Sequence, residues 1–200
     1  MARDTIGLMD ALGIKSAHVV GLSMGGMIAQ EIAISFPARL RSLTSIMSTT
    51  GNPRIPPPTR EATAVLMAPP PATREEYFAR FAQTWKVLRV GHFPVDEALD
   101  RSRAERIFER GLNPAGVGRQ FRAILASGSR KERLHTVTAP TLVIHGTVDP
   151  LVHPMGGKDT AASISGAKLL MIEGMGHALP IPMWPEIIGA IADHARGART

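Results

Sequence analysis

Residues 17–33 of this chain read AHVVGLSMGGMIAQEIA, and this stretch decides the fold. Its first part, AHVVGL, is a short apolar run rich in valine, which is typical of a buried β-strand. The apolar residues after it recur at helical spacing as far as Phe36, and Pro37 then stops the helix. The stretch therefore predicts a strand over 17–22 that turns abruptly into a helix over 26–36.

The junction between this strand and this helix carries the pattern G-x-S-x-G, with Ser23 at its centre. Such a turn requires small residues beside the serine, and it holds the hydroxyl so that it projects as a nucleophile. The N–H of Met24 points into the same space and is a candidate oxyanion donor, while Gly26 lets the helix pack close to the sheet. A glycine-rich turn without chemistry is the alternative, but the strand before it and the helix after it favour the nucleophile.

A serine becomes a useful nucleophile only beside a base, and the base needs a group that orients it. Asp149 follows the predicted strand 140–146, and His177 follows the predicted strand 167–174. Because the carboxyl ends of parallel strands share one edge of a sheet, both side chains should lie beside Ser23. The chain order Ser, Asp, His also accompanies G-x-S-x-G.

Other histidines and carboxylates are weaker candidates for these roles. His145 precedes the acid at a strand end and is expected to hydrogen-bond locally, while His153 falls in a proline-rich turn and could line a pocket. Asp159 is the alternative carboxylate, but it falls in a predicted helix. The histidines do not show the spacing of metal ligands, so we expect neither a metal nor a cofactor.

Four residues are predicted to form walls of a substrate pocket. Leu22 precedes the serine, Leu151 and Met175 lie in the loops after the two later strands, and Trp184 follows the second of these loops. Methionines are numerous in these segments. Core filling is the simpler interpretation, and a soft, adaptable pocket for an acyl or alcohol group is the alternative.

Strands and helices alternate at both ends of the chain, and a proline-rich helical block separates them. The alternation predicts an α/β fold with a parallel sheet of about four strands flanked by helices. We expect a core over 1–51 and 135–200, and an inserted helical cap over 52–134. Seven of the sixteen prolines fall between 53 and 71, which predicts an irregular segment there. Further strands are expected over 40–47, 140–146 and 167–174, and further helices over 3–12, 73–90, 94–110, 114–128, 155–164 and 184–195.

The composition of the chain limits the kinds of partner and the location that we expect for it. Of its 200 residues, 44% are hydrophobic and 20% charged, which is typical of a globular protein. The net charge of +6 comes from scattered arginines, and the few aromatic residues do not alternate with a basic run, so nucleic-acid binding is not expected. There is no cysteine, no apolar run near the ~20 residues of a membrane span and no signal-peptide pattern, so we expect a soluble, cytoplasmic protein.

The three motifs together resemble the α/β-hydrolase fold family. AHVVGLSMGGMIAQEIA is similar to the family's nucleophile turn, APTLVIHGTVDPLV (139–152) to its acid strand and AKLLMIEGMGHALP (167–180) to its histidine strand. The stretch 145–180, which begins HGTVDPLVHP and ends GMGHALP, is similar to the aclacinomycin methylesterase-like group. The resemblance implies a serine esterase or lipase without a cofactor, with Ser23 as nucleophile, Asp149 as acid and His177 as base.

The start of the sequence departs from the family pattern. Family members carry further strands before the nucleophile, and a loop there supplies a second oxyanion donor. The resemblance therefore implies that the N-terminal half of the domain is lacking, and the loss of one donor costs about 10²–10³ in rate. Strand 17–22 would be an exposed sheet edge, and a homo-oligomer is expected to cover it.

The sequence as a whole predicts a carboxylic ester hydrolase that acts on small to medium acyl esters through an acyl-enzyme intermediate. Two alternatives stay open. One is a truncated remnant or interaction subunit that keeps the motifs without turnover. The other is a perhydrolase, like the metal-free haloperoxidases, that uses the same three residues.

Overall fold

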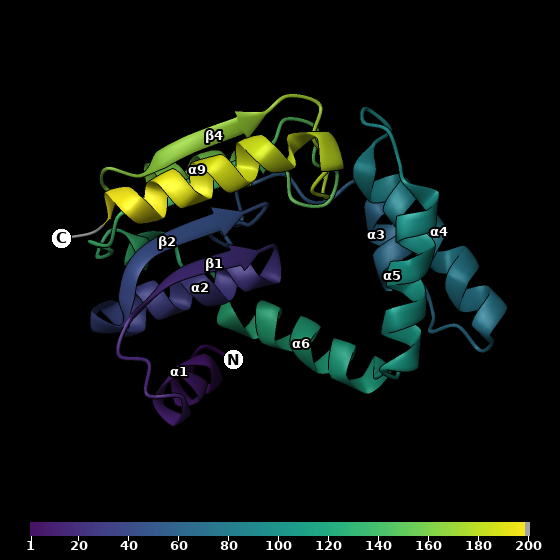
Figure 1. The fold of residues 1–200 in the computed structure, drawn as a ribbon, viewed down its shortest axis with the longest axis horizontal. Coiled ribbons are helices and arrows are strands. Elements are labelled where there is room, and N and C mark those ends of the chain that lie inside the picture. Colours follow the sequence, from purple (N-terminus) through teal and green to yellow (C-terminus); the bar gives the residue numbers. More distant parts are fainter. Residues whose placement is uncertain (199–200) are drawn as a thin grey trace.

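The computed structural model describes residues 1–198, in which four strands form a parallel sheet with helices around it (Figure 1). The strands lie in the order β1-β2-β3-β4, and each neighbouring pair is parallel. The carboxyl ends of all four strands therefore meet at one edge of the sheet, which is where the candidate site lies. The strands are β1 (Ala17–Leu22), β2 (Leu40–Ile46), β3 (Thr141–Gly146) and β4 (Lys168–Ile172).

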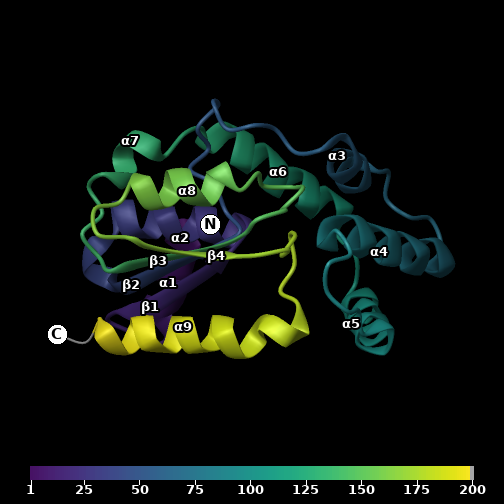
Figure 2. The same cartoon turned by 90° about the horizontal axis from the view of Figure 1, so that it is seen from above.

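Helices cover both faces of the sheet. Helices α2 and α8 pack on one face and α9 on the other, while α1 packs against α2 (Figure 2). Every residue of β3 is buried, because both faces of this strand are covered. These helices are α1 (Ala2–Ala11), α2 (Met24–Ser35), α8 (Met155–Ala162) and α9 (Trp184–Gly197), and short 3₁₀ turns run over Pro37–Arg39 and Ile181–Met183.

The hydrophobic core has two parts. One lies among α1, α2 and the sheet, and Ile6, Ile32 and Leu43 belong to it. The other lies between the sheet and α9, and it includes Ile144 and Ile187. The buried face of helix α1 is narrower than the spacing of its apolar residues predicts. Whereas Ile6 and Met9 are buried, Leu8 and Leu12 are 59% and 63% exposed.

A group of helices lies beside the carboxyl edge of the sheet, and α6 runs back from it toward the sheet (Figure 1). We name residues 52–134 the cap, in keeping with the proposed division of the chain. Its helices are α3 (Arg60–Met67), α4 (Arg74–Arg89), α5 (Glu97–Glu109), α6 (Pro114–Ser127) and α7 (Lys131–Leu134).

Helix α3 corrects the expectation of an irregular segment over 53–71. The stretch 60–67 contains no proline, and the Thr59 hydroxyl caps it by accepting the N–H of Ala62 at 3.1 Å. Thr73 caps α4 in the same way, because its hydroxyl accepts the N–H of Glu76 at 3.1 Å. The Glu76 carboxylate reaches back to the N–H of Ala72, one residue earlier than in the usual capping box.

The two ends of the cap are tied to the core by hydrogen bonds and an ion pair. Arg130 is 2% exposed, and its guanidinium donates to the Thr49 carbonyl at 2.9 Å and to Gln30 Oε1 at 3.0 Å. Lys131 Nζ lies 2.6 Å from Asp159 Oδ1, and the Thr50 hydroxyl donates to Asp159 Oδ2 at 2.6 Å. These contacts join the segment that enters the cap to the segment that leaves it.

Strand β1 lies at an edge of the sheet and pairs with β2 along its length. Two of its apolar side chains, Val20 and Leu22, are 49% and 44% exposed. None of the helices described over residues 1–198 combines the length and the hydrophobicity that crossing a membrane requires.

Candidate active site

Ser23 occupies the sharp turn between β1 and α2. Its backbone has φ 54° and ψ −116°, a left-handed conformation that residues other than glycine rarely adopt. Such a conformation costs on the order of 1–3 kcal/mol and persists only where the surroundings impose it. Here the N–H of Ser23 donates to the Ile46 carbonyl at 2.8 Å, which continues the pairing of β1 with β2 into the turn. The turn therefore fixes the serine hydroxyl above the edge of the sheet.

Two glycines make this turn possible. A Cβ atom on Gly21 would lie 2.1 Å from the Gly25 carbonyl oxygen, and one on Gly26 would lie 2.5 Å from Ser48 Cβ. The prediction that Gly26 allows close packing of the helix on the sheet is confirmed. In contrast, a Cβ atom on Gly25 would meet nothing within 4 Å. The first glycine of the G-x-S-x-G pattern is therefore the one that the turn requires for space.

The structure brings the three predicted polar side chains together. His177 Nε2 lies 2.9 Å from Ser23 Oγ, and His177 Nδ1 lies 2.7 Å from Asp149 Oδ2. The other carboxylate oxygen, Oδ1, accepts the N–H groups of Leu151 at 2.9 Å and Val152 at 2.8 Å. The Asp149 carboxylate is thus held on both oxygens, and the hydrogen bonds run from it through the imidazole to the hydroxyl.

Met24 is the first residue of α2, directly after the serine. The N–H groups of a helix's first turn have no acceptor within the helix, and they carry its partial positive charge. The N–H of Met24 is therefore available for an oxygen that develops negative charge beside Ser23.

The loop that carries His177 rests on the end of cap helix α4. The N–H of His177 donates to the Leu88 carbonyl at 2.7 Å. A Cβ atom on the preceding residue, Gly176, would lie 2.4 Å from the same carbonyl oxygen. The cap therefore sets the position of this histidine through its own backbone, a contact that no local sequence pattern indicates.

The alternative carboxylate does not join this group. The burial of Asp159 raises its pKa, but hydrogen bonds from Lys131, Thr50 and Asn52 outweigh this effect and hold the pKa below its usual value. Its bonds hold the ends of the cap rather than a histidine. His153 is also occupied locally, because its Nδ1 accepts the N–H of Met155 at 3.2 Å.

The local hydrogen bond expected of His145 is confirmed. Its Nε2 lies 2.9 Å from the Val152 carbonyl oxygen. The ring also approaches Asp149, with Nε2 3.5 Å from Oδ2. This second contact was not predicted from the sequence, although the i, i+4 spacing of His145 and Asp149 across a strand end is a signal that could have indicated it.

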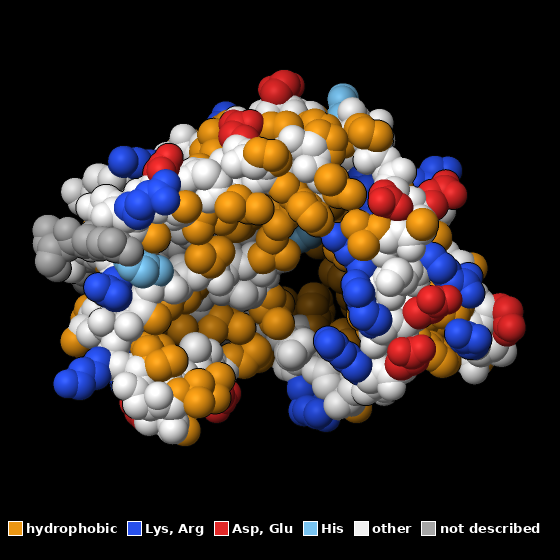
Figure 3. All heavy atoms as spheres, viewed as in Figure 1, with side chains coloured by type: hydrophobic (Ala, Val, Ile, Leu, Met, Phe, Trp, Pro, Cys, Tyr) orange, Lys and Arg blue, Asp and Glu red, His pale blue; other side chains and the backbone are white. Residues whose placement is uncertain are grey.

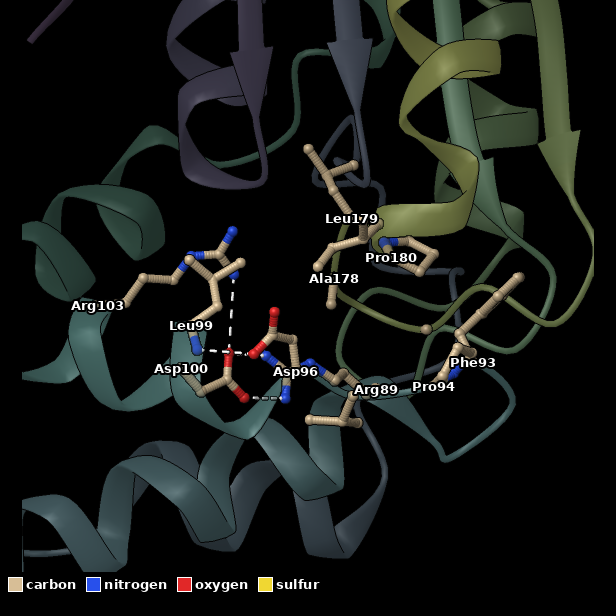
Figure 4. Close-up of a pocket in the computed structure, with 13 residues that line it drawn as sticks. Arg89, Phe93, Pro94, Asp96, Leu99, Asp100, Arg103, Ala178, Leu179 and Pro180 are labelled. Carbon is tan, nitrogen blue, oxygen red and sulfur yellow. Dashed lines mark hydrogen bonds and ion pairs between the residues drawn. The ribbon is translucent and has the colours of Figure 1, made fainter.

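A pocket opens beside the histidine loop, between this loop and the cap (Figure 4). It encloses about 430 Å³, part of which is open to solvent, and Gly176 and Ala178 on either side of His177 contribute to its lining. Figure 3 shows a hollow between the sheet and the cap, with hydrophobic side chains around it and Lys or Arg side chains on the cap side. Most of the pocket lining is apolar: Phe93, Pro94, Val95 and Leu99 from the cap, and Ala178, Leu179, Pro180 and Ile181 from the loop.

Charged groups gather on the cap wall of this pocket. Arg89 binds the Asp100 carboxylate through both of its terminal nitrogens, and Nη2 lies 2.6 Å from Oδ1 (Figure 4). Arg103 lies farther from the same carboxylate, at 3.8 Å, and its guanidinium lies 5.9 Å from the centre of the Trp184 ring. The cap and the start of α9 therefore approach each other across the pocket.

The four predicted wall residues lie at different depths. Met175 is fully buried in the core beneath α9, whereas Leu22 is exposed beside the serine. Trp184 is half-buried, and its indole N–H donates to the carbonyl of Leu179, a lining residue, at 3.0 Å. Leu151 is half-buried in the loop that carries the acid. Their contact with a substrate stays a prediction.

Comparisons with known proteins agree with this geometry. The family model described as alpha/beta hydrolase fold matches residues 1–182. The rhodomycin D methylesterase DauP of Streptomyces sp. (strain C5) is 30% identical over 224 residues, covering 99% of this chain and 73% of the relative. The 2-hydroxy-6-oxo-6-phenylhexa-2,4-dienoate hydrolase of Comamonas testosteroni is 32% identical over 179 residues, covering 88% of this chain and 61% of the relative.

Solved structures show the same fold. The meta-cleavage product hydrolase CumD of Pseudomonas fluorescens IP01 superposes with a TM-score of 0.77 at 24% identity, covering 98% of this chain and 70% of that one. A hydrolase of Pseudomonas aeruginosa PA01 has a TM-score of 0.67 at 27% identity. The strand order, the turn at Ser23 and the match over residues 1–182 lead to one conclusion: the chain belongs to the α/β-hydrolase fold family.

Proposed function

We propose that this protein hydrolyses carboxylic esters with Ser23 as the nucleophile. One observation carries the proposal: a continuous chain of hydrogen bonds from Asp149 through His177 to a serine held in a left-handed strand–helix turn. An adjacent base, itself oriented by a third group, is what activates a hydroxyl. Family membership and the methylesterase relatives support ester hydrolysis as the general chemistry.

The reaction follows from the roles of these groups. His177 Nε2 takes the proton of Ser23 as the hydroxyl oxygen attacks the ester carbonyl, and the Asp149 carboxylate stabilises the imidazolium that forms. The N–H of Met24 donates to the oxyanion of the tetrahedral intermediate. His177 then protonates the departing alcohol, and an acyl-enzyme remains on Ser23. A water molecule attacks the acyl-enzyme with His177 again as base, which releases the acid.

We further propose small to medium acyl esters as the substrates, among them methyl esters. The apolar pocket beside His177 would hold one side of the ester, and the relatives named rhodomycin D methylesterase suggest a small departing alcohol. In this proposal residues 1–51 and 135–200 form the core, and the cap closes the pocket from the other side. Leu22 and Trp184 remain candidates for contacts with substrate at the rim.

The test compares hydrolysis of p-nitrophenyl acetate and butyrate, and of methyl esters in a pH-stat, by the wild type and two serine variants. Ser23→Ala should lose at least about 10³-fold in kcat, because the remaining groups cannot supply a nucleophile. Ser102→Ala, a serine of the cap, is the matched control and should keep its activity. Equal hydrolysis by Ser23→Ala and wild type would refute the assigned nucleophile, and an inactive wild type would refute the proposed function. Peroxide-dependent bromination by the same proteins addresses the perhydrolase alternative.

A further inference from the structure

A second histidine lies against the acid and has no part in the steps above. His145, near the end of β3, is completely buried. Its Nε2 lies 2.9 Å from the Val152 carbonyl oxygen and 3.5 Å from Asp149 Oδ2. Asp149 Oδ2 is also the oxygen that His177 Nδ1 contacts. Among the residues that the structure describes, Nδ1 of His145 has no hydrogen-bond partner.

These contacts fix the proton of the His145 ring. A carbonyl oxygen can only accept, so Nε2 must carry the hydrogen and Nδ1 is the bare nitrogen. The bare nitrogen faces Gly157 of α8, where an added Cβ atom would lie 2.6 Å from it. A second proton on Nδ1 would be a buried donor without an acceptor among the described residues, which is costly. Burial also lowers the pKa of this histidine and so favours the neutral ring. The charged or titratable groups that act on it are Asp149, His177 and His153.

The neutral ring completes the turn that holds the acid. The N–H of Val152 donates to Asp149 Oδ1, and the carbonyl of the same residue accepts from His145. Both polar groups of this residue are thus engaged, one by the carboxylate and one by the histidine. Movement of the His145 ring would release the Val152 carbonyl and, with it, one of the two N–H groups that orient the carboxylate.

We propose that His145 is a positioning residue for the Asp149–His177 pair. As a neutral Nε2–H donor to the Val152 carbonyl, it locks the 149–152 turn, and its ring lies beside the carboxylate oxygen that accepts from His177. This inference rests on the proposed function, because it assigns a role in the same reaction. His145 acts through Asp149 and contacts neither the serine nor the substrate.

The substitution that removes the donor but keeps a ring is His145→Phe. We expect kcat to fall about tenfold with KM unchanged, the lower end of the 10- to 100-fold that loss of a group orienting a metal ligand typically costs. Loss of the donor frees the Val152 carbonyl and loosens the Val152 N–H that donates to Asp149 Oδ1. The negative charge of the carboxylate is then less offset, which favours the protonated ring of His177. The acid limb of kcat/KM should therefore move to higher pH.

His145→Gln is the rescue variant, because the Gln amide nitrogen can take the place of imidazole Nε2 and donate to the Val152 carbonyl. It should restore the position of the acid limb and return kcat to within about threefold of the wild type. His135→Phe is the matched control, since this histidine is exposed at the end of α7. Thermal unfolding of each variant reports whether it is folded. A purely structural role would lower the melting temperature without moving the acid limb.

A nitrogen-15 NMR experiment on labelled imidazoles tests the proposal without turnover. His145 should show a protonated Nε2 and a bare Nδ1 from pH 8 to pH 5. The proton between His177 and Asp149 should shift in His145→Phe and return in His145→Gln. A protonated Nδ1, an unmoved acid limb and proton signal in folded His145→Phe, or a Gln variant as impaired as Phe would each overturn the proposal. Full activity of Ser23→Ala with the expected NMR result would instead overturn the proposed function alone.

Discussion

A methyl group added at Gly176 tests whether the cap positions the candidate base. In Gly176→Ala the new Cβ would lie 2.4 Å from the Leu88 carbonyl oxygen and 2.8 Å from the Arg89 carbonyl oxygen, where ordinary contacts begin at 3.4 Å. Both neighbours are backbone atoms near the end of α4, so no side chain can swing away. The histidine loop and the helix end must therefore separate by about 1 Å, the shortfall at the nearer contact.

This displacement has two separate consequences. Forcing an extra methyl group into packed structure destabilises a fold by about 1–3 kcal/mol, which a melting curve measures. A misplacement of about 1 Å at a reacting group costs about 10²-fold in rate. His177 moves with the loop because it directly follows Gly176, and the separation stretches the bond from its N–H to the Leu88 carbonyl. We therefore expect kcat for p-nitrophenyl butyrate to fall about 100-fold at temperatures where the variant remains folded.

Gly189→Ala is the matched control. It adds the same methyl group within α9, at a position where a Cβ atom meets nothing within 4 Å. Alanine is the better helix former by roughly 0.5–1 kcal/mol, so this variant should melt slightly higher and keep full activity. The reasoning fails if folded Gly176→Ala retains more than about a third of the wild-type kcat, or if the two variants behave alike.

Three further predictions concern the turn, the pH dependence of stability and the sheet edge. Gly21→Ala should abolish hydrolysis or folding, whereas Gly25→Ala should keep its kcat within about threefold of the wild type because its Cβ is unobstructed. A kcat that is lower in Gly25→Ala than in Gly21→Ala would contradict this account of the turn. Burial lowers the pKa of His145 and His194 below 6.5, so the unfolded chain binds protons that the folded chain does not. The melting temperature should fall as the pH drops below about 6.5. If the melting temperature of His194→Gln fell with pH as steeply as that of the wild type, a contribution from His194 would be contradicted. We propose that a second chain covers β1, so light scattering should find an oligomer that Val20→Lys weakens; a monomeric wild type would refute this.

The sequence was most informative where chemistry and secondary structure coincide. The stretch around Ser23 predicted a strand, a tight turn and a helix, and β1 has the bounds that were expected. The helix begins two residues earlier than predicted, at Met24, because the serine itself absorbs the unusual backbone conformation. The acid and the base could be placed at one sheet edge because parallel strands share their carboxyl ends.

Contacts between distant segments could not be read in the same way. Helix α3 escaped notice because prolines on both sides hid an eight-residue stretch with good helix formers. The bond from His177 to Leu88 and the bonds from Arg130 to Thr49 and Gln30 join segments that share no local pattern. The acceptors are backbone carbonyls in two of these three bonds. Every residue has a backbone carbonyl, so the type of residue does not show which carbonyl accepts a bond.

These carbonyl contacts bear on how the cap affects catalysis. A cap that only enclosed substrate would alter KM when it is perturbed, because it would change binding alike in ground and transition states. Here the end of α4 holds the backbone of His177, and the two ends of the cap are pinned to the core at Asp159 and Arg130. Perturbation at Leu88 must therefore reach the base directly. Substitutions that shift the end of α4 should lower kcat, while those on the outer face of α5 should leave it unchanged.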